Sequence, residues 1–238
     1  MIQMQAFKRG AWTAYRWLLD VFLPPQCVMC GKVETWLCDG CVQKLPLFTG
    51  PFCSRCGRPW EGSPTCRVCQ TKPLSVSPIR SAYLFQGNVR DLLHAFKYRG
   101  GKSMVRQLAR PMAQAWRELG MHGNALVPVP LHPRRLDQRG YNQAEILARG
   151  LAHELGIPML RALERVRDTP SQTRLNAQER RKNVAAAFTY TAGDLLVGKY
   201  VTLVDDVATT GATLDACATV LLAQGVESVS AFTLARAP

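Results

Sequence analysis

The chain has 238 residues, 47% of them apolar and 20% charged, a composition typical of a globular protein with one sizeable core and a smaller module. Its formal net charge is +13: residues 1–182 carry 28 Lys and Arg against 12 acidic residues, and residues 183–238 carry two against five. A basic body favours a polyanionic partner, such as nucleic acid or a phosphorylated substrate. The most apolar early stretch, WLLDVFLPP, is about half the length that spans a bilayer, which argues against membrane insertion.

Large apolar residues recur at helical spacing between Trp12 and Phe22, and this predicts an N-terminal helix over residues 1–23, ended by the Pro-Pro pair that follows. Arg16 and Asp20 interrupt the apolar run, and no A-x-A-like cleavage site follows it. The segment is therefore not expected to be a signal peptide, and we expect a cytoplasmic protein.

Eight of the nine cysteines form four pairs, CVMC, CDGC, CSRC and CRVC, within residues 24–72. In a reducing compartment this spacing favours tetrahedral zinc over disulfides. Four ligands per ion predict two structural zinc ions in a double zinc ribbon, because all-cysteine sites leave no coordination position open for a substrate. We expect sequential sites, although an interleaved arrangement also fits the spacing. The sequential ligand sets are Cys27, Cys30, Cys38, Cys41 and Cys53, Cys56, Cys66, Cys69.

Two interpretations of these ribbons are open. They could grip nucleic acid or a partner with Arg55, Arg58 and Arg67 and the aromatic Trp36 and Trp60. Alternatively they form a small scaffold that needs metal because it is too short to build a core, and the two tryptophans serve as its packing.

A Pro- and Ser-rich linker is expected over residues 73–80, before a domain over residues 81–238 in which strands and helices alternate. In chain order we expect a strand at SAYLF, a helix at VRDLLHAFKY, and a helix at KSMVRQLARPMAQAWREL that Pro111 kinks or breaks. A strand at ALVPVPL and helices at YNQAEILARGLAHELG and AQERRKNVAAAF follow. The last elements are a strand at KYVTLVDD, a helix at TLDACATVLLAQG and a strand at VESVSAFTLA. This alternation predicts an α/β fold with a mainly parallel sheet and helices on both faces.

The stretch VTLVDDVATTGATL carries the most specific chemistry, because ligands in such folds bind beyond the carboxyl ends of the strands. Residues 201–204 are expected to form a strand that delivers Asp205 and Asp206 to the rim. Two carboxylates there suit the two hydroxyls of a ribose, or Mg²⁺. The following loop turns into a helix N-terminus, whose amides, hydroxyls and dipole suit one phosphate. The loop residues are Ala208, Thr209, Thr210, Gly211, Ala212 and Thr213.

The same stretch resembles the 5-phosphoribosyl-1-pyrophosphate (PRPP) signature of type I phosphoribosyltransferases. Nearly the whole chain resembles the ComF family of competence-related proteins, through LDVFLPPQCVMC, AFKYRG, VPVPLHPRRLDQRGYNQAE and TPSQTRLNAQERRKNVAAAF. The resemblance implies a phosphoribosyltransferase domain behind a double zinc ribbon, with Asp205 and Asp206 as the catalytic pair that holds the ribose hydroxyls of PRPP with Mg²⁺. It also implies a role in the uptake or use of external single-stranded DNA, alongside DNA-uptake proteins.

By the same resemblance, the pyrophosphate would face cations of the rim loop after the strand at 126–131 and of the AFKYRG segment, and residues 165–182 resemble a hood that closes over the site. The pyrophosphate candidates are Lys97, Arg134, Arg135 and Arg139. The hood candidates are Gln172, Arg174, Arg180, Arg181 and, at its edge, Asn183. Purine-salvage enzymes usually place an acid where this chain has Thr209, which argues against 6-oxopurine salvage.

Three functions therefore stand at this point. The chain is a Mg²⁺-dependent phosphoribosyltransferase with an unidentified acceptor, a protein that handles single-stranded DNA, or a regulator that binds PRPP without turning it over. The first two are compatible with each other.

Overall fold

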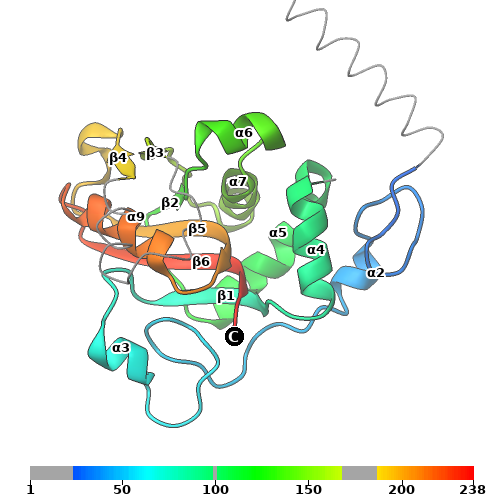
Figure 1. The fold of residues 1–238 in the computed structure, drawn as a ribbon, viewed down its shortest axis with the longest axis horizontal. Coiled ribbons are helices and arrows are strands. Elements are labelled where there is room, and N and C mark those ends of the chain that lie inside the picture. Colours follow the sequence, from blue (N-terminus) through cyan, green and yellow to red (C-terminus); the bar gives the residue numbers. More distant parts are fainter. Residues whose placement is uncertain (1–23, 99–100, 168–186) are drawn as a thin grey trace, which may run out of the picture.

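The computed structural model describes residues 24–98, 101–167 and 187–238 (Figure 1). The helix expected over residues 1–23, most of the helix expected at AQERRKNVAAAF and the hood candidates from Gln172 to Asn183 lie outside the described residues.

A four-stranded sheet forms the centre of the molecule, and its strand order is β1-β6-β5-β2. All three pairings are parallel, and the longest runs from Tyr200 opposite Ser228 to Ala208 opposite Arg236. The central strands are apolar on both faces, as expected where helices cover both sides of a parallel sheet. The strands are β1 (Ile79–Leu84), β2 (Ala125–Pro128), β5 (Tyr200–Ala208) and β6 (Ser228–Arg236).

Helices cover both faces of this sheet, as the alternating pattern predicts (Figure 1). Three of them pack against one face, where their side chains share a buried cluster with Phe232 and Leu234 of β6. The fourth packs on the opposite face against Leu203 and Ala231. The first three are α4 (Asn88–Tyr98), α5 (Gly101–Glu118) and α7 (Gln143–Leu155), and the fourth is α9 (Ala212–Leu222).

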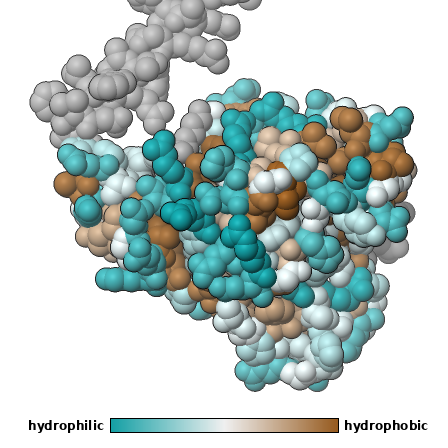
Figure 2. Space-filling view, turned by 180° about the vertical axis from the view of Figure 1, so that it is seen from behind, coloured by the Kyte–Doolittle hydropathy of each residue, from teal (hydrophilic) through white to brown (hydrophobic). Residues whose placement is uncertain are grey.

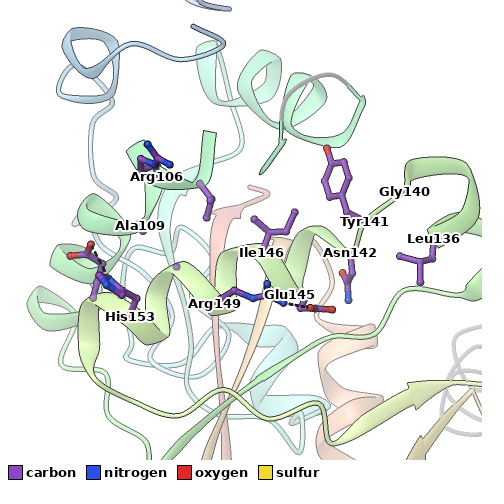
Figure 3. Close-up of a pocket in the computed structure, with 13 residues that line it drawn as sticks. Arg106, Ala109, Leu136, Gly140, Tyr141, Asn142, Glu145, Ile146, Arg149 and His153 are labelled. Atoms are coloured by element: carbon purple, nitrogen blue, oxygen red, sulfur yellow. Dashed lines mark hydrogen bonds and ion pairs between the residues drawn. The ribbon is translucent and has the colours of Figure 1, made fainter. Parts of the chain in front are cut away.

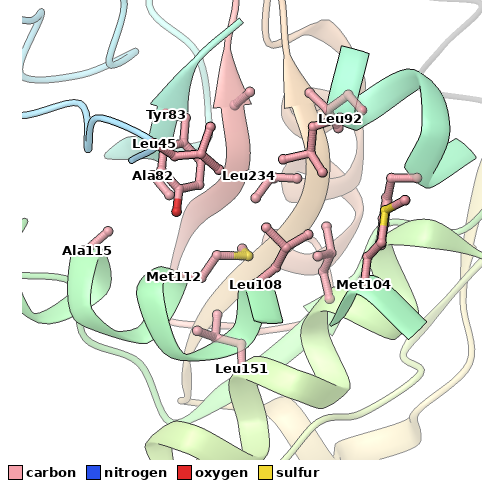
Figure 4. Close-up of a cluster of buried hydrophobic side chains, with 14 of the residues drawn as sticks. Leu45, Ala82, Tyr83, Leu92, Met104, Leu108, Met112, Ala115, Leu151 and Leu234 are labelled. Atoms are coloured by element: carbon pink, nitrogen blue, oxygen red, sulfur yellow. The ribbon is translucent and has the colours of Figure 1, made fainter. Parts of the chain in front are cut away.

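The helix α5 runs unbroken through Pro111, so of the kink or break predicted here the break is wrong. Leu108 and Met112, on either side of the proline, are fully buried in the cluster that joins α4, α5 and α7 to the sheet (Figure 4). Burial of these side chains offsets the backbone hydrogen bond that the proline cannot donate.

The cysteine-rich segment contains two short helices, α2 (Asp39–Val42) and α3 (Arg67–Thr71). Its first half packs on α5, because Leu45 lies in the same buried cluster as Met104 (Figure 4). Its second half packs beneath the other face of the sheet, where Cys53 shares a cluster with Ile79. The two halves therefore contact different parts of the domain that contains the sheet. The strand β1 begins two residues earlier than the expected strand.

Smaller elements border the sheet: the helix α6 (Pro133–Arg139), the antiparallel pair β3 (Leu163–Arg165) and β4 (Phe188–Tyr190), and the 3-10 helix η1 (Gly193–Leu196). On the face seen in Figure 2, hydrophobic patches alternate with hydrophilic side chains. Among the described residues, no helix combines the length and the apolar character needed to cross a bilayer.

Candidate functional site

The eight paired cysteines form two sequential tetrads, so the sequential partition is confirmed and the interleaved one is wrong. Within each tetrad the Sγ atoms all lie within 4.8 Å of one another. The Sγ–Sγ distance is 3.7 Å between Cys30 and Cys38 and 3.8 Å between Cys56 and Cys66. A tetrahedron with zinc–sulfur bonds of about 2.3 Å has edges of about 3.8 Å, so both tetrads fit a zinc ion.

The backbone around the thiols also favours metal binding. Gly57, at a φ of 66°, donates its N–H to the carbonyl of Cys53, and a Cβ at this glycine would lie 2.3 Å from the Ile79 carbonyl oxygen. The N–H of Cys66 donates to Cys53 Sγ at 3.3 Å. Burial acts to raise the pKa of Cys53, but backbone N–H groups outweigh it and lower the pKa to about 6. The first tetrad repeats the two hydrogen bonds and the lowered pKa around Cys27, but a Cβ at its glycine, Gly31, would meet nothing within 4 Å.

Three of the five residues proposed to grip nucleic acid from the ribbons are engaged within the protein, whereas Arg67 is exposed. The guanidinium of Arg55 donates to the Leu74 carbonyl at 3.1 Å, and the indole N–H of Trp60 donates to the Ser63 carbonyl at 2.9 Å. Trp36 is half-buried against the cluster on α5. These contacts favour the scaffold interpretation of the two ribbons.

Asp205 and Asp206 lie at the carboxyl edge of the sheet, but inside a strand that is longer than expected. The strand β5 continues to Ala208, whereas the neighbouring β2 pairs with it only as far as Pro128 opposite Val204. The two aspartates therefore lie just beyond the end of β2, where the N–H of Asp206 donates to Asp205 Oδ1 at 2.8 Å.

Asp206 has a cationic partner, Lys97, whereas Asp205 has a raised pKa. The ammonium of Lys97 at the end of α4 lies 2.9 Å from Asp206 Oδ2, and both side chains are partly buried. Burial, together with the charge of Asp206, raises the pKa of Asp205 to about 8, against the opposing effects of the Asp206 backbone N–H and Lys97. A raised pKa beside a second carboxylate indicates a carboxyl group that would be stabilised by a cation or by hydroxyl donors.

The loop after Asp206 has the geometry of an anion seat. Thr209 and Thr210 are exposed, and the Thr210 hydroxyl accepts the N–H of Ala212 at 3.3 Å. Gly211 has a φ of 83° at the N-cap of α9, and a Cβ there would lie 2.8 Å from Leu74 Cδ1. Of the six residues expected in the loop, Ala208 ends β5, and Ala212 and Thr213 form the first turn of α9. The loop thus presents hydroxyls beside a helix N-terminus, where the dipole favours negative charge.

The three rim arginines lie on a helix, α6, and not in the expected loop. His132 caps this helix by accepting the Arg134 N–H at 3.3 Å, Pro133 occupies the first turn, and Gly140 ends it. These residues are the usual start and stop signals of a helix. The helix between them has only seven residues, too few to show the repeating apolar face that predicts longer helices. The helix carries Arg134, Arg135 and Arg139.

The structure brings one of these arginines to the end of α4. The guanidinium of Arg139 lies 5.4 Å from the ring centroid of Tyr98, the residue after Lys97, and donates to Gln143 at 3.1 Å. Lys97 and Arg139 therefore belong to the same edge of the molecule. The strands β3 and β4, which flank residues 168–186, pair with each other.

Three residues that carry no role in the sequence motifs hold backbone segments around the end of β5. Tyr141 donates its hydroxyl to the Phe96 carbonyl, and Asn142 donates to the Val129 carbonyl at 3.0 Å while capping α7. Both lie in the quoted segment RGYNQAE, but only the structure shows what they contact. The third, Arg236, donates to the carbonyls of Ala208 and Thr209, and its charge at the end of the uncharged strand β6 is the one signal that could have identified it.

A cavity of about 790 Å³ lies between α5 and α7 (Figure 3). Arg106, Ile146 and Arg149 line it, and Arg149 is paired with Glu145 at 2.7 Å. Among the described residues, neither aspartate of the pair lines this cavity. The cavity is therefore separate from the aspartate pair on β5.

Comparison with known families and proteins agrees with this organisation. The family described as "Double zinc ribbon domain" matches residues 18–70, and the family described as "Phosphoribosyl transferase domain" matches residues 136–238. The first match contains both cysteine tetrads, and the second contains the aspartate pair and the loop that follows it.

Three curated relatives cover most of the chain. "Competence protein ComFC" of Bacillus subtilis (strain 168) is 30% identical, covering 86% of this chain and 86% of its own. "Competence protein F" of Haemophilus influenzae is 33% identical, covering 89% and 97%, and "DNA utilization protein YhgH" of Salmonella typhi is 32% identical, covering 90% and 98%. With its double zinc ribbon and phosphoribosyltransferase domain, the chain belongs to the ComF family of competence and DNA-utilisation proteins.

Proposed function

We propose that the chain binds PRPP with Mg²⁺ at the carboxyl edge of β5, as a phosphoribosyltransferase-type site, and that it takes part in the uptake or use of external single-stranded DNA. One observation carries the first half of this proposal: the adjacent Asp205 and Asp206 lead directly into the loop at Thr209–Thr213 and the N-terminus of α9. Ribose hydroxyls would bind the carboxylates, and the 5′-phosphate would bind the loop.

The donor set suits both parts of the ligand. Carboxylate oxygens are hard ligands, so Asp205 and Asp206 would hold Mg²⁺ together with the pyrophosphate. When bound, the ion would neutralise charge on the pyrophosphate leaving group. Lys97 lies within reach of the same region, since its ammonium already contacts Asp206.

Transfer of the phosphoribosyl group would displace pyrophosphate from the anomeric carbon through an oxocarbenium-like state. Such a reaction depends on positioning, charge neutralisation and exclusion of water more than on a strong base. Here the aspartates position the ribose, the loop at Thr209–Thr213 fixes the phosphate, and Arg139 and Lys97 supply positive charge at the pyrophosphate end.

Two alternatives to this function are a nucleotide-salvage phosphoribosyltransferase without a DNA role and a regulator that binds PRPP. Thr209 provides no carboxylate for a purine base, which argues against 6-oxopurine salvage but leaves other acceptors open. A regulator that binds PRPP without turnover is the second alternative, and it predicts saturable binding with no pyrophosphate release for any acceptor.

The names of the relatives and the charge distribution support the role in DNA handling. The curated relatives carry the words "competence" and "DNA utilization" in their names. Residues 1–182 hold 28 of the 30 Lys and Arg residues, an excess that suits a polyanionic strand.

Calorimetric titration of PRPP into the full chain, with and without Mg²⁺ and with and without a single-stranded oligonucleotide, tests both halves. We expect Mg²⁺-dependent PRPP binding whose affinity changes when the oligonucleotide is present. An affinity for PRPP that is the same with and without the oligonucleotide would separate the DNA role from the PRPP site. An absence of PRPP binding under every condition would refute the PRPP site itself.

A further inference from the structure

The second cysteine tetrad and the phosphate loop are joined by one buried side chain, Arg236, which is 1% exposed. Its Nη1 donates to the carbonyl of Ala208 at 2.6 Å and also to that of Thr209, where the loop begins. Its Nε donates to the carbonyl of the tetrad residue Cys56 at 3.0 Å. One rigid guanidinium thus fixes the backbone of a metal ligand and the backbone of the anion seat at the same time.

The segment that follows the second tetrad makes two further contacts with the loop and its helix. Leu74 packs closely on Gly211, because a Cβ at this glycine would lie only 2.8 Å from Leu74 Cδ1. The N–H of Ser75 donates to Asp215 Oδ1 in the first turn of α9 at 2.6 Å. The segment is in turn held by the tetrad loop, since Arg55 donates to the Leu74 carbonyl at 3.1 Å.

The backbone of the tetrad loop also pairs with the start of β1. The N–H of Ile79 donates to the carbonyl of Arg55 at 2.7 Å. Gly57 approaches the Ile79 carbonyl so closely that no side chain fits between them. Loss of the zinc that orders residues 53–58 would therefore release contacts on both sides of the phosphate loop.

The first tetrad is placed differently. Its module packs on α5 through Leu45, in the cluster that contains Met104. The two tetrads are alike in their CxxC pairs and sulfur geometry but contact different parts of the domain, so each serves as the control for the other.

We propose that zinc in the second tetrad and the anion in the phosphate loop are energetically coupled through Arg236, Leu74 and Ser75, whereas zinc in the first tetrad is not. This inference rests on the proposed PRPP site. The residues of the second tetrad fit the ion by their sulfur spacing, and the contacts above supply the path. Coupling is reciprocal, so zinc raises the affinity for PRPP by the same factor by which PRPP raises the affinity for zinc.

Zinc release to a chromogenic chelator, measured on the full chain with and without PRPP and Mg²⁺, tests the coupling. We expect two zinc ions to be released, and PRPP to slow the release of one of them by about tenfold, within the usual range of coupling between sites. The protected ion should be missing from Cys66→Ser and present in Cys38→Ser, since these residues are the third ligands of the two tetrads. Ribose 5-phosphate should protect the same ion, because the loop is the seat of the 5′-phosphate.

The reciprocal measurement is PRPP affinity in the same two variants. Cys66→Ser should bind PRPP about tenfold more weakly than the parent, and Cys38→Ser should bind it like the parent. Equal effects of PRPP on both zinc ions, or on neither, in a parent that binds PRPP would overturn the coupling. A parent that binds neither PRPP nor ribose 5-phosphate would overturn the proposed function, and the coupling with it.

Weak PRPP binding by Cys66→Ser could also result from misfolding, so a second variant keeps all zinc ligands in place. Asp215→Ala removes the hydrogen bond to Ser75, and it also removes a negative charge beside the phosphate loop. Electrostatics alone would then strengthen anion binding. The coupling predicts the opposite sign, with PRPP bound about three- to tenfold more weakly and less protection of the second zinc. Stronger PRPP binding by Asp215→Ala would contradict the coupling.

Discussion

Substitution of Gly211 by alanine provides a quantitative test of how the phosphate loop is built. Gly211 has a φ of 83°, a conformation that costs a residue with a side chain about 1–2 kcal/mol. The new Cβ would also lie 2.8 Å from Leu74 Cδ1 and 3.3 Å from Ile79 Cδ1. Because Leu74 is half-buried and its side-chain end can shift, this overpacking should cost about 1 kcal/mol, the lower end of the usual range. We therefore expect Gly211→Ala to lower the free energy of unfolding by about 2–3 kcal/mol.

Gly225 offers a matched control at the other end of α9. Its φ is 81°, and a Cβ there would meet only Val197, at an ordinary contact distance of 3.6 Å. Gly225→Ala should cost only the conformational part, about 1–2 kcal/mol, and should bind PRPP like the parent. Urea unfolding followed by circular dichroism gives the free energies, and calorimetry gives the PRPP affinities.

The double variant Gly211→Ala/Leu74→Ala separates the two contributions further. Removing Leu74 relieves the steric contact with the new Cβ, so this variant should recover part of the affinity for PRPP that Gly211→Ala loses. If Gly211→Ala were no more destabilised than Gly225→Ala and bound PRPP equally well, the close packing of the loop against Leu74 would have no role in the site.

Three further predictions concern charge. Because the pKa of Asp205 is raised to about 8, the folded state holds a proton that the unfolded state has lost above about pH 4. The free energy of unfolding should therefore fall as the pH rises from about 5 to 8. Asp205→Asn should flatten this pH dependence, as measured by urea unfolding at saturating zinc. Lys97→Met, which removes the partner of Asp206, should weaken PRPP binding about tenfold but ribose 5-phosphate binding much less, as competition calorimetry would reveal. Binding of a single-stranded oligonucleotide should weaken steeply with added salt, and a flat dependence in fluorescence anisotropy would argue against a basic surface that neutralises phosphates.

The fold could be predicted because its signals are local and repeated. Apolar runs such as that before Asp205 occur between amphipathic helices, and this alternation is the pattern of a parallel sheet covered on both faces. Spacing alone could not decide between sequential and interleaved zinc ligands, because both satisfy the same four CxxC pairs. The fold decided it by bringing each consecutive set of four thiols together.

What the sequence could not supply were contacts between distant segments. Periodicity gave no reason to place the ammonium of Lys97 beside Asp206, which lies more than a hundred residues further along the chain. Arg236 carries no motif, and its function follows only from the carbonyls that surround it. The helix α6 was missed because it is short, so its cap residues, and not a repeating apolar face, determine it.

The most direct test of the central claim compares PRPP binding in the parent and in Asp206→Asn by calorimetry in the presence of Mg²⁺. The substitution keeps the size and shape of the side chain but removes the charge that the proposed site needs. Loss of one charge-assisted interaction predicts an affinity at least about tenfold weaker in the variant, with both tetrads still loaded with zinc. A variant that bound PRPP as tightly as the parent would contradict the placement of the site at the end of β5.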